Sequence, residues 1–563
     1  MTQQFDAIVV GSGITGGWAA KELTEKGLKT LVLERGRFIE HGKDYSGEHQ
    51  PPWAYDFRGK VPREEAERDY FIQSKFGWFD AYNKQFWNND RLNPYIVDEK
   101  KPFHWVRANV LGGRSILWGR QCYRWSDLDF EANKKDGHGI DWPIRYRDIE
   151  PWYDYVEDFV GVSGEALGLP QLPDGKFLKP MELNIVEKRF KQSLEQNFSD
   201  RVLTIGRVAI LTEPKNGRGA CHYCGPCSRG CSVAAYFCSL SSTLPAAQAT
   251  GNLTIRANSV VEGLDYDPQS GKVTAVRVID AETKERHRFT SKVIFLCAST
   301  VGSTQVLLNS ATDAMPNGLA NSSGVLGKYM MDHTFQTGVS GIIPGFENKY
   351  EFGNRPNGIY IPRFRNLEGQ DEDADFVRGY GYQGGVHRLN WNQMSKETPG
   401  FGAEFKQALR NPGPWRAGFG GFGEILPHED NYMALDRSQP DRFGIPQVRF
   451  NVEYRENERR MIDDIMKQGT AMLEAAGATD IKADPGPMIM GRGVHEMGTA
   501  RMGDDPGESV LNKWNQAHDA PNLFVTDGAC MTSASCVNPS ITYMALTARA
   551  VNHAVTLLAE GTI

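Results

Sequence analysis

The hydrophobic pattern near the N-terminus predicts a βαβ unit. A short apolar run over residues 7–10 stops abruptly at Gly11, which is typical of a buried parallel strand. Apolar residues then fall on one helical face over residues 19–23, and Gly27 ends this helix. A second apolar run over residues 30–34 completes the unit.

Strand patterns return in the second half of the chain. Short runs rich in β-branched residues occupy residues 253–256 and 273–278, and residues 292–296 form another apolar run. The chain ends on a strand and turn over residues 523–528 and a helix over residues 541–558. We therefore expect the last part of the chain to belong to the same lobe as the N-terminal unit.

A different pattern fills the region between these strands. Residues 335–450 carry alternating Gly, aromatic and β-branched residues, which predicts a large antiparallel sheet, and a charged helix follows around residues 456–476. The fold class is therefore α/β (α+β overall), with a discontinuous Rossmann-like nucleotide-binding lobe and a second, sheet-based lobe. We assign residues 1–40, 104–130, 215–330 and 485–563 to the nucleotide-binding lobe, and residues 41–103, 131–214 and 331–484 to the second lobe and its excursions.

Composition and charge mainly exclude classes of partner and of location. The 563 residues include 63 Lys and Arg against 70 Asp and Glu, a net charge of −7, and no long basic block points to nucleic acid. Apolar runs such as residues 293–296 are far shorter than the roughly 20 residues that a membrane span needs. Residues 1–6 have neither a basic start nor an apolar region, so we expect a soluble chain without an export signal of its own.

The turn after the first strand has the sequence of a dinucleotide-binding loop. Gly11-Ser12-Gly13-Ile14-Thr15-Gly16 fits G-x-G-x-x-G between a strand and a helix, whose N-terminus stabilises a pyrophosphate. Glu34 ends the second strand, where a carboxylate can accept hydrogen bonds from ribose hydroxyls. An ordinary Gly-rich turn would not explain Glu34. The loop alone does not distinguish FAD from NAD.

The nine cysteines are unevenly placed along the chain, and five of them crowd into one stretch. Four have the C-x2-C-x2-C-x3-C spacing of bacterial iron–sulfur sites: Cys221, Cys224, Cys227 and Cys231. Zinc sites usually draw their ligand pairs from segments farther apart, and two disulfides in so short a loop would be strained. We therefore predict an iron–sulfur cluster in the loop 218–238. Ser232 stands where Pro is usual and Cys238 is a spare ligand, so both a 3Fe-4S and a 4Fe-4S cluster remain open.

The C-terminal part carries a distinctive order of motifs. Residues 494–503 (VHEMGTARMG) come first, then residues 523–528, then Val537-Asn538-Pro539-Ser540. With the Gly112-Gly113 turn and residues 298–305, these motifs make nearly the whole chain resemble the glucose–methanol–choline (GMC) oxidoreductases, flavoenzymes that oxidise alcohols. The resemblance implies the fold of that family, with an FAD-binding lobe and a substrate-binding lobe. It also implies FAD held by Gly11, Gly13, Gly16, Glu34, Gly112, Gly113, Ser115 and Asp527.

The resemblance places a catalytic pair on His495 and Asn538. A neutral imidazole within reach of the alcohol is a suitable general base, because hydride leaves the carbinol carbon more easily as the hydroxyl loses its proton. Asn538 would donate to the same oxygen and aim the C–H bond at the flavin. Structural roles compete with this assignment, since a single histidine is often structural and Asn538 before Pro539 is typical of a helix N-cap. His333 and His428 are weaker candidates for the substrate pocket.

One departure from the family bears on how FAD is held. Pyranose oxidases of the family carry a histidine, covalently bonded to FAD, in the turn that matches residues 112–118. This chain has Leu117 at that position. We therefore expect FAD to be bound noncovalently.

The iron–sulfur motif makes the chain similar to a bacterial branch that includes FAD-dependent glucose, gluconate and fructose dehydrogenases and glucoside 3-dehydrogenase. Residues 218–236 and 328–333 look most like the glucoside 3-dehydrogenase group, which oxidises C3 of a glucopyranosyl unit to a ketone. The resemblance implies hydride transfer from a secondary hydroxyl to FAD and electron exit through the cluster to an external acceptor. Aromatic residues between Trp53 and Trp105 would suit stacking on a sugar, or form core.

Two alternatives stay open: another GMC alcohol, polyol or sugar-acid dehydrogenase or oxidase, or a non-catalytic flavin–iron–sulfur electron carrier. His495 and Asn538 speak against the second. Large subunits of the branch often pair with a small subunit that carries the export signal. The resemblance thus implies a small subunit, a cytochrome c-type acceptor and a periplasmic location reached by co-export, although a cytoplasmic location fits the sequence equally well.

Overall fold

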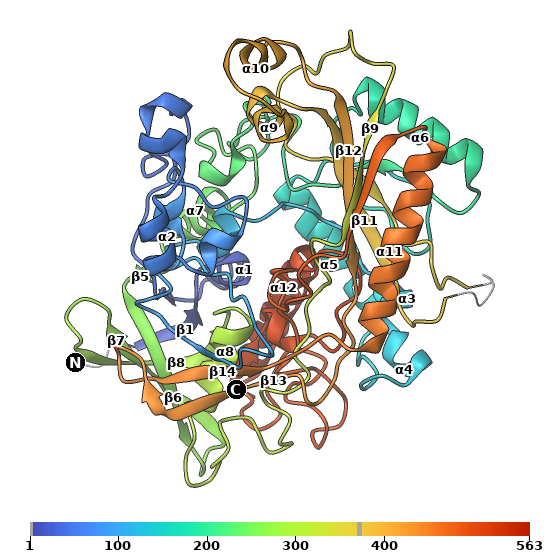
Figure 1. Ribbon diagram of the computed structural model, residues 1–563. Coiled ribbons are helices and arrows are strands. Elements are labelled where there is room, and N and C mark those ends of the chain that lie inside the picture. The colour runs from blue at the N-terminus through green and yellow to red at the C-terminus, as the bar shows by residue number, and fades with distance from the viewer. Residues whose placement is uncertain (1–3, 369–373) are drawn as a thin grey trace.

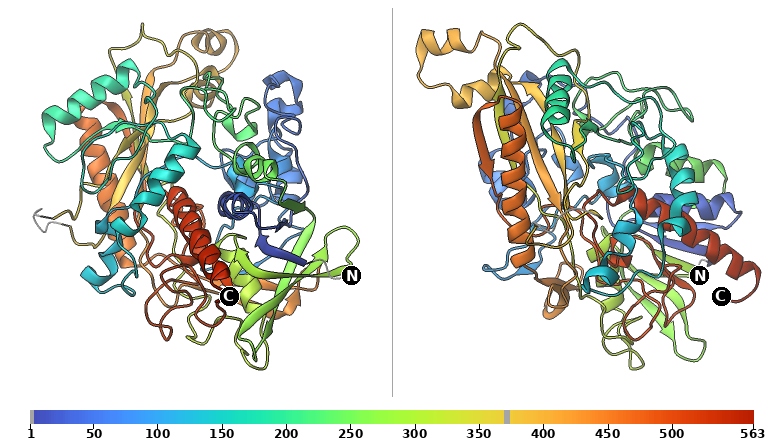
Figure 2. Two further views of the ribbon diagram at one scale, coloured as in Figure 1. Left: turned by 180° about the vertical axis from the view of Figure 1, so that it is seen from behind. Right: turned by 90° about the vertical axis from the view of Figure 1, so that its right-hand side faces the viewer.

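The chain forms two sheet-based lobes, as the computed structural model of residues 4–368 and 374–563 shows (Figure 1). One lobe contains the N-terminal strands, and the other contains the long antiparallel strands on the opposite side of the view. The C-terminal helix α12 (Ser540–Ala559) runs between them and packs against α1 (Ile14–Glu25) and α5 (Tyr146–Val160) (Figure 2).

The predicted N-terminal βαβ unit lies in a seven-stranded sheet. β1 (Gln4–Val10) pairs in parallel with β2 (Thr30–Leu33) and with β8 (Arg286–Leu296). β5 (Leu253–Arg256) adds to β2, and β16 (Leu523–Val525) adds to β8, both in parallel. The last four residues of β1 and all of β2 are buried, which explains why their sequences are continuous apolar runs. The final segment of the chain thus rejoins the N-terminal sheet.

The same sheet has an antiparallel extension. β6 (Ser259–Asp267) and β7 (Lys272–Asp280) pair with each other, and β7 also pairs with β8. Helix α8 (Thr300–Leu308) follows β8 and contacts β6, and α7 (Thr243–Ala249) packs on α1.

The predicted antiparallel sheet is six-stranded, in the order β15-β9-β12-β11-β10-β4. Along β12 buried and half-buried residues alternate, as expected for a sheet with one covered face. Helix α11 (Glu456–Ala475), which matches the predicted charged helix, packs against β9, β12 and β15. The strands are β4 (Thr204–Ile205), β9 (Gly338–Ile343), β10 (Ile359–Ile361), β11 (Tyr380–Arg388), β12 (Trp415–Gly423) and β15 (Thr479–Asp484).

The end of the 335–450 region departs from the prediction of one large sheet. β14 (Pro446–Asn451) pairs with β13 (Tyr432–Pro440) on one side and with the short β3 (Ile96–Val97) on the other, in a separate three-stranded sheet. The reason is packing, because Met433 and Phe450 belong to a cluster with Phe103 and not to the core of the large sheet.

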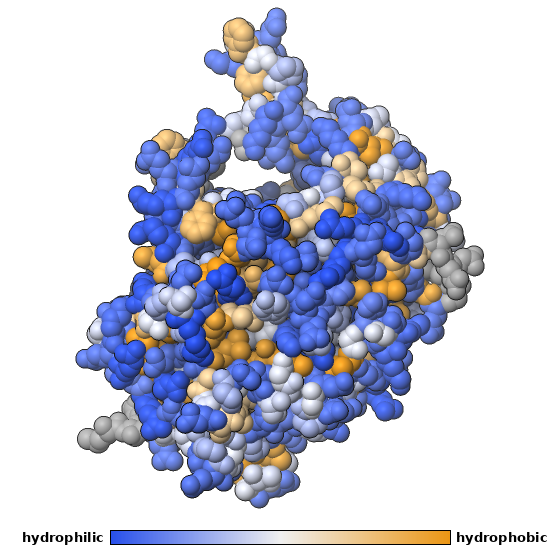
Figure 3. Space-filling model, turned by 60° about the horizontal axis from the view of Figure 1, so that its bottom comes forward, coloured by the Kyte–Doolittle hydropathy of each residue, from blue (hydrophilic) through white to orange (hydrophobic). Residues whose placement is uncertain are grey.

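The face of the molecule in Figure 3 is mostly hydrophilic, with hydrophobic residues in small groups. Within the described residues, no helix has the length and apolar character needed to cross a membrane. Residues 1–3 lie outside the described part, so the expected lack of an export signal stays a prediction. The helices not yet named are α2 (Arg63–Asp69), α3 (Asp127–Phe130), α4 (Ala132–Asp136), α6 (Ile185–Asn197), α9 (Trp391–Glu397) and α10 (Gly402–Ala408).

Candidate active site and cofactor cavity

The tight turn between β1 and α1 borders a large cavity. A Cβ at Gly11, whose φ is +95°, would lie 2.4 Å from the carbonyl oxygen of Cys297. A Cβ at Gly16 would lie 2.0 Å from the carbonyl oxygen of Gly11, so these two positions require glycine. Gly13, in contrast, lines the cavity and has no atom within 4 Å of its Cβ position. The turn therefore leaves backbone open at the N-terminus of α1, where a phosphate group binds well.

Glu34 lies at the end of the second strand and is buried on the wall of the same cavity. One carboxylate oxygen accepts hydrogen bonds from the amide, at 3.1 Å, and the hydroxyl of Ser12. The other accepts from the amide of Gly36 at 2.7 Å. Burial raises the pKa of Glu34. These bonds fix the carboxylate beside the loop, as ribose recognition requires.

The turn at residues 112–115 closes on the loop from the other side. The amide of Gly112 donates to the Ser12 hydroxyl at 2.8 Å, so Ser12 joins both the Glu34 carboxylate and this turn. The Ser115 hydroxyl donates to the carbonyl of Gly112 at 2.5 Å and accepts from the amide of Ser239 at 3.1 Å. Gly113 and Ser115 line the cavity, whereas Gly112 supports them from behind.

Asp527 occupies the cavity wall after β16. Its carboxylate accepts from the amide of Ala529 at 3.0 Å and from the hydroxyl of Ser303. Burial raises the pKa of Asp527 to about 6. Six of the eight residues predicted to hold FAD thus line one cavity in the structure: Gly11, Gly13, Glu34, Gly113, Ser115 and Asp527. The other two, Gly16 and Gly112, lie just behind its wall.

The cavity has a volume of about 570 Å³ and extends from the G-x-G-x-x-G loop to His495 and Asn538. Three polar atoms of its lining residues are buried and have no hydrogen-bond partner in the described part of the chain: Arg107 Nε, Arg120 Nε and Tyr543 Oη. Unpaired buried polar atoms are costly, so a polar ligand is expected to satisfy them. With the open backbone at Gly13 and the carboxylate of Glu34, they fit an extended dinucleotide.

His495 and Asn538 meet at the far end of this cavity. His495 Nε2 lies 3.4 Å from Asn538 Nδ2, and the Asn538 side-chain oxygen accepts a hydrogen bond from Gln383 Nε2. Burial, together with the nearby His333 and Arg114, holds the pKa of His495 well below its ordinary value. The imidazole is therefore neutral at pH 7, which is the form that can accept a proton.

Asn538 is not the N-cap of the last helix. The helix begins at Ser540 and its N-cap residue is Pro539, without a side-chain capping bond. The Asn538 amide instead bonds to Gln383 on β11 and faces His495, so its side chain belongs to the cavity.

His333 lies behind His495, with 2.8 Å between their Nδ1 atoms, and does not itself line the cavity. The neighbouring Asp332 is fully buried and accepts from the backbone amides of Gly491, Gly493 and His495 at 2.8, 3.0 and 3.0 Å. Burial, and then the charge of Glu496, raise the pKa of Asp332 to about 7. Asp332 therefore holds the loop that carries His495.

Asp332 and Gln383 lie in no sequence motif that predicts a site role, and His333 is only a weak candidate from the sequence. No local sequence pattern could reveal the contact between His333 and His495, because the two residues are 162 positions apart in the chain and meet only in the folded structure. The other weak candidate, His428, lies outside the cavity lining.

Aromatic rings form the wall next to His495. The ring of Phe422 lies 6.1 Å from that of His495, Phe335 lies 5.5 Å from Phe422, and Trp78 lies 6.0 Å from Phe335. All three aromatic residues line the cavity, as do Trp87 and Trp105. Of the aromatic residues between Trp53 and Trp105, Trp78, Trp87 and Trp105 thus line the cavity, whereas Trp53 is 84% exposed, and their stacking on a sugar stays a prediction.

The four spaced cysteines all line one small, separate cavity, and all nine cysteines are free thiols. The disulfide alternative therefore does not hold in the structure. Cys238 is buried outside this small cavity, with its sulfur 3.2 Å from the Ser241 hydroxyl. Over the described ranges, no three His, Cys, Asp or Glu side chains are grouped closely enough to hold a metal ion. The iron–sulfur cluster stays a prediction.

The two cavities come close at the cysteine loop. Cys227 lines the small cavity and the next residue, Ser228, lines the large one. Arg120, on the wall of the large cavity, donates to the carbonyl of Cys227 at 2.7 Å and packs 4.0 Å from the ring centre of Tyr236.

Comparisons with known proteins agree with this layout. Residues 5–335 and 427–547 match the N-terminal and C-terminal family models of GMC oxidoreductase. The chain is 30% identical to 2-methyl-1,2-propanediol dehydrogenase of Mycolicibacterium austroafricanum, over 97% of this chain and 94% of that protein. It is 24% identical to the fructose dehydrogenase large subunit of Gluconobacter japonicus, over 100% and 99%. Pyridoxine 4-oxidase from Mesorbium loti shares the fold, with a TM-score of 0.58, 16% identity and coverage of 98% and 99%.

Proposed function

The chain belongs to the GMC oxidoreductase family, and we propose that within it the protein is a dehydrogenase that oxidises a secondary hydroxyl of a sugar or glycoside. As a member, it is an FAD-dependent enzyme that acts on CH–OH groups of alcohols or sugars. The observation that carries the proposal is the pair of His495 Nε2 and Asn538 Nδ2, 3.4 Å apart at the end of the cavity. Our specific proposal for the reacting position is C3 of a glucopyranosyl unit.

The chain's own residues supply the proton chemistry. His495, whose neutral ring leaves Nε2 without a hydrogen, takes the proton of the substrate hydroxyl as a general base. Asn538 Nδ2 donates to the same oxygen and holds the alcohol in one orientation, while Gln383 fixes the amide. Bound FAD supplies a hydride acceptor. We propose that it is held noncovalently by the loop glycines, Glu34, the 112–115 turn and Asp527.

The aromatic wall supports a sugar as the substrate. Trp78, Phe335 and Phe422 offer flat apolar faces to the C–H side of a pyranose ring, while His495 and Asn538 address one hydroxyl. Such a combination of apolar walls and a few polar groups is typical of specific small-molecule sites. The similarity to a fructose dehydrogenase large subunit supports the same substrate class.

A second candidate is a diol or polyol dehydrogenase. It is favoured by the 30% identity to a 2-methyl-1,2-propanediol dehydrogenase over nearly the whole chain. The same base and amide would serve this reaction, because both substrates present a hydroxyl on the carbon that is oxidised.

We also propose that Cys221, Cys224, Cys227 and Cys231 hold an iron–sulfur cluster. The donor set supports this, since four free thiols with the spacing of an iron–sulfur motif line one cavity. Such a cluster would supply one-electron transfer. The contact between Cys227 and the wall of the large cavity supports a role in electron exit to an external acceptor.

The similarity to a protein named as a large subunit supports an assembly with a further, smaller subunit. A cytochrome c-type acceptor is part of the same proposal. Export together with such a partner to the periplasm is the location we propose, with the cytoplasm as the alternative. Fractionation of cells that express the chain with and without a candidate small subunit would distinguish the two locations.

Anaerobic absorption spectra of the FAD-loaded enzyme test the substrate. Addition of methyl glucoside is expected to bleach the oxidised-flavin band, and NMR of the product should show a ketone at C3. Bleaching by 2-methyl-1,2-propanediol but not by any sugar would transfer the assignment to the second candidate. If a sugar reduces the flavin but is oxidised at another carbon, the assignment to a sugar dehydrogenase stands and only the proposal of C3 as the reacting position fails.

A further inference from the structure

The environment of His333 fixes which of its ring nitrogens carries a hydrogen. His333 Nε2 lies 2.9 Å from the carbonyl oxygen of Ser535 and 3.4 Å from that of Ala534. Carbonyl oxygens only accept hydrogen bonds, so Nε2 must be the donor. The ring is fully buried and burial lowers the pKa of His333 to about 4, so it is neutral and has a single N–H. His333 Nδ1 is therefore an acceptor.

The same reasoning then fixes the tautomer of His495. Its Nδ1 lies 2.8 Å from the acceptor Nδ1 of His333, so His495 Nδ1 carries the hydrogen and donates it. In a neutral ring, His495 Nε2 is left with a free lone pair, and this atom faces Asn538 and the cavity. Without an acceptor behind it, His495 could place its hydrogen on Nε2, where it could not act as a base.

We propose that His333 is a positioning residue that holds His495 in the tautomer with hydrogen on Nδ1 and so keeps Nε2 free to take the substrate's hydroxyl proton. This inference rests on the proposed role of His495 as the base. When Nε2 has taken that proton, the ring is cationic and its Nδ1–H remains donated to His333. Hydrogen bonds from a charged donor are roughly twice as strong as neutral ones, so the same contact favours the protonated base.

The fold holds His333 rigidly for this task. Its backbone pairs with Glu424 in an isolated antiparallel bridge, and the Tyr454 hydroxyl donates to its carbonyl at 3.3 Å. The Ser535 hydroxyl donates to Asp129 at 2.7 Å, which anchors the segment whose carbonyl accepts from His333.

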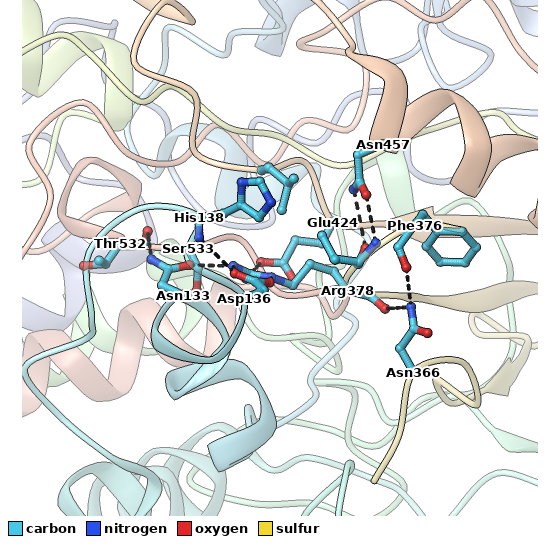
Figure 4. A network of polar contacts seen from close by, with 12 residues as sticks. Asn133, Asp136, His138, Asn366, Phe376, Arg378, Glu424, Asn457, Thr532 and Ser533 are labelled. Atoms are coloured by element: carbon cyan, nitrogen blue, oxygen red, sulfur yellow. Dashed lines mark hydrogen bonds and ion pairs between the residues drawn. The ribbon is translucent and has the colours of Figure 1, made fainter. Parts of the chain in front are cut away.

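A buried polar network links Glu424, the backbone partner of His333, to the loop that precedes Ser535 (Figure 4). Arg378 donates to Glu424 at 2.7 Å and to Asn133 at 2.8 Å, and Asn133 donates to the carbonyl of Thr532 at 3.0 Å. The network thus links the end of β12, helix α4 and the loop that leads to Ser535. The ring of His333 itself contacts His495 and the carbonyls of residues 534 and 535. The charged side chain of Arg378 instead contacts Glu424, whose backbone pairs with that of His333.

Two variants of equal size test the proposal. His333→Asn keeps an oxygen acceptor close to the position of Nδ1, and His333→Leu has the same number of non-hydrogen atoms but no acceptor. We expect the Asn enzyme to reduce its flavin with substrate within about tenfold of the wild-type rate. The Leu enzyme should be slower by about a hundredfold or more, because loss of a correct histidine tautomer removes general-base catalysis. KM should change little in either variant, since His333 does not line the cavity.

A spectroscopic measurement tests the tautomer without relying on turnover. Nitrogen-15 NMR of the FAD-loaded, histidine-labelled enzyme, with His495 assigned from its loss in His495→Gln, should show an unprotonated Nε2 and a protonated Nδ1. A hydrogen on Nε2 in the wild-type enzyme would overturn the proposal even if neither variant folds.

Two further results would also overturn it: equal slowing of the Asn and Leu enzymes, or a wild-type rate in the Leu enzyme. Failure of the proposed function looks different. In that case the wild-type flavin is not reduced by any sugar or diol, while the NMR result for His495 still stands.

Discussion

At the residue scale, the tautomers of the two histidines are specified by partners that only accept hydrogen bonds. The carbonyl oxygens behind His333 leave one position for its single hydrogen, and the contact between the two Nδ1 atoms then leaves one position for the hydrogen of His495. A lone pair on His495 Nε2 and the side-chain amide of Asn538 therefore face the cavity.

The pKa of His495 leads to a prediction for the pH dependence of the reaction. Because the folded-state pKa lies well below the ordinary value of about 6.5, the imidazole is already neutral at that pH. Titration of His495 should therefore leave the rate constant for flavin reduction unchanged from about pH 6.5 to 8 and lower it only at more acidic pH, as the ring gains a proton. Any change in the rate near pH 7 is expected from Asp332, whose pKa burial raises to about 7. Stopped-flow flavin reduction at a series of pH values measures it. An acid limb at or above pH 6.5 that persists in Asp332→Asn would contradict the assignment.

The sequence predicts His495 and Asn538 as a pair only because both lie in C-terminal motifs that resemble those of the GMC family. It does not identify Gln383 or Asp332, whose roles depend on contacts with segments more than a hundred positions away. A buried partner of this kind leaves no local pattern in a single sequence.

At the scale of elements, the strand–turn–helix unit at the N-terminus is the most predictable part of the chain. Its apolar runs are explained by burial in the sheet, and its glycines by close backbone contacts that leave no room for a Cβ at Gly11 and Gly16. The antiparallel sheet is predictable from alternation, but the separate β13–β14–β3 sheet is not. Its strands carry the same residue types, and only the packing of Met433 and Phe450 assigns them elsewhere.

Two glycine variants of the loop are expected to affect different properties, FAD affinity in one and protein stability in the other. Gly13→Ala meets no protein atom within 4 Å and has an ordinary φ of −66°, so the apo-protein should keep its stability within about 0.5 kcal/mol. Its new methyl group points into the space where the pyrophosphate is expected, so the Kd for FAD should rise at least about tenfold. Titration of apo-protein with FAD and thermal unfolding measure the two effects.

Gly16→Ala is the matched control for this prediction. Its Cβ would collide with the Gly11 carbonyl oxygen, so the variant should lose stability with or without FAD. Normal FAD affinity in Gly13→Ala would show that the pyrophosphate does not lie on this loop.

At the scale of the whole molecule, the important relation is between two cavities that share a wall. Cys227 and Ser228 are neighbours in the chain but line different cavities. Arg120 bonds across this wall. The sequence shows both motifs, but their proximity follows only from the fold.

Replacement of one cysteine tests this relation. Cys227→Ser should lose bound iron and transfer electrons to an external one-electron acceptor more slowly, while substrate still reduces the flavin at close to the wild-type rate. Iron analysis and separate rates for the two half-reactions give the answer. Cys238→Ser is the control, because Cys238 lies outside the small cavity and its replacement should leave iron content unchanged. Equal loss of both half-reactions in Cys227→Ser would indicate a structural cluster.

The most direct test of the account is the anaerobic rate of flavin reduction in His495→Ala, beside His428→Ala as a control outside the cavity. Both variants should bind FAD and give the oxidised-flavin spectrum. We expect substrate to reduce the flavin of His495→Ala about 10²- to 10⁴-fold more slowly than in the wild type, the usual contribution of a general base, and that of His428→Ala at the wild-type rate. Undiminished reduction in His495→Ala would contradict the assignment of the base and the inference about His333 that depends on it.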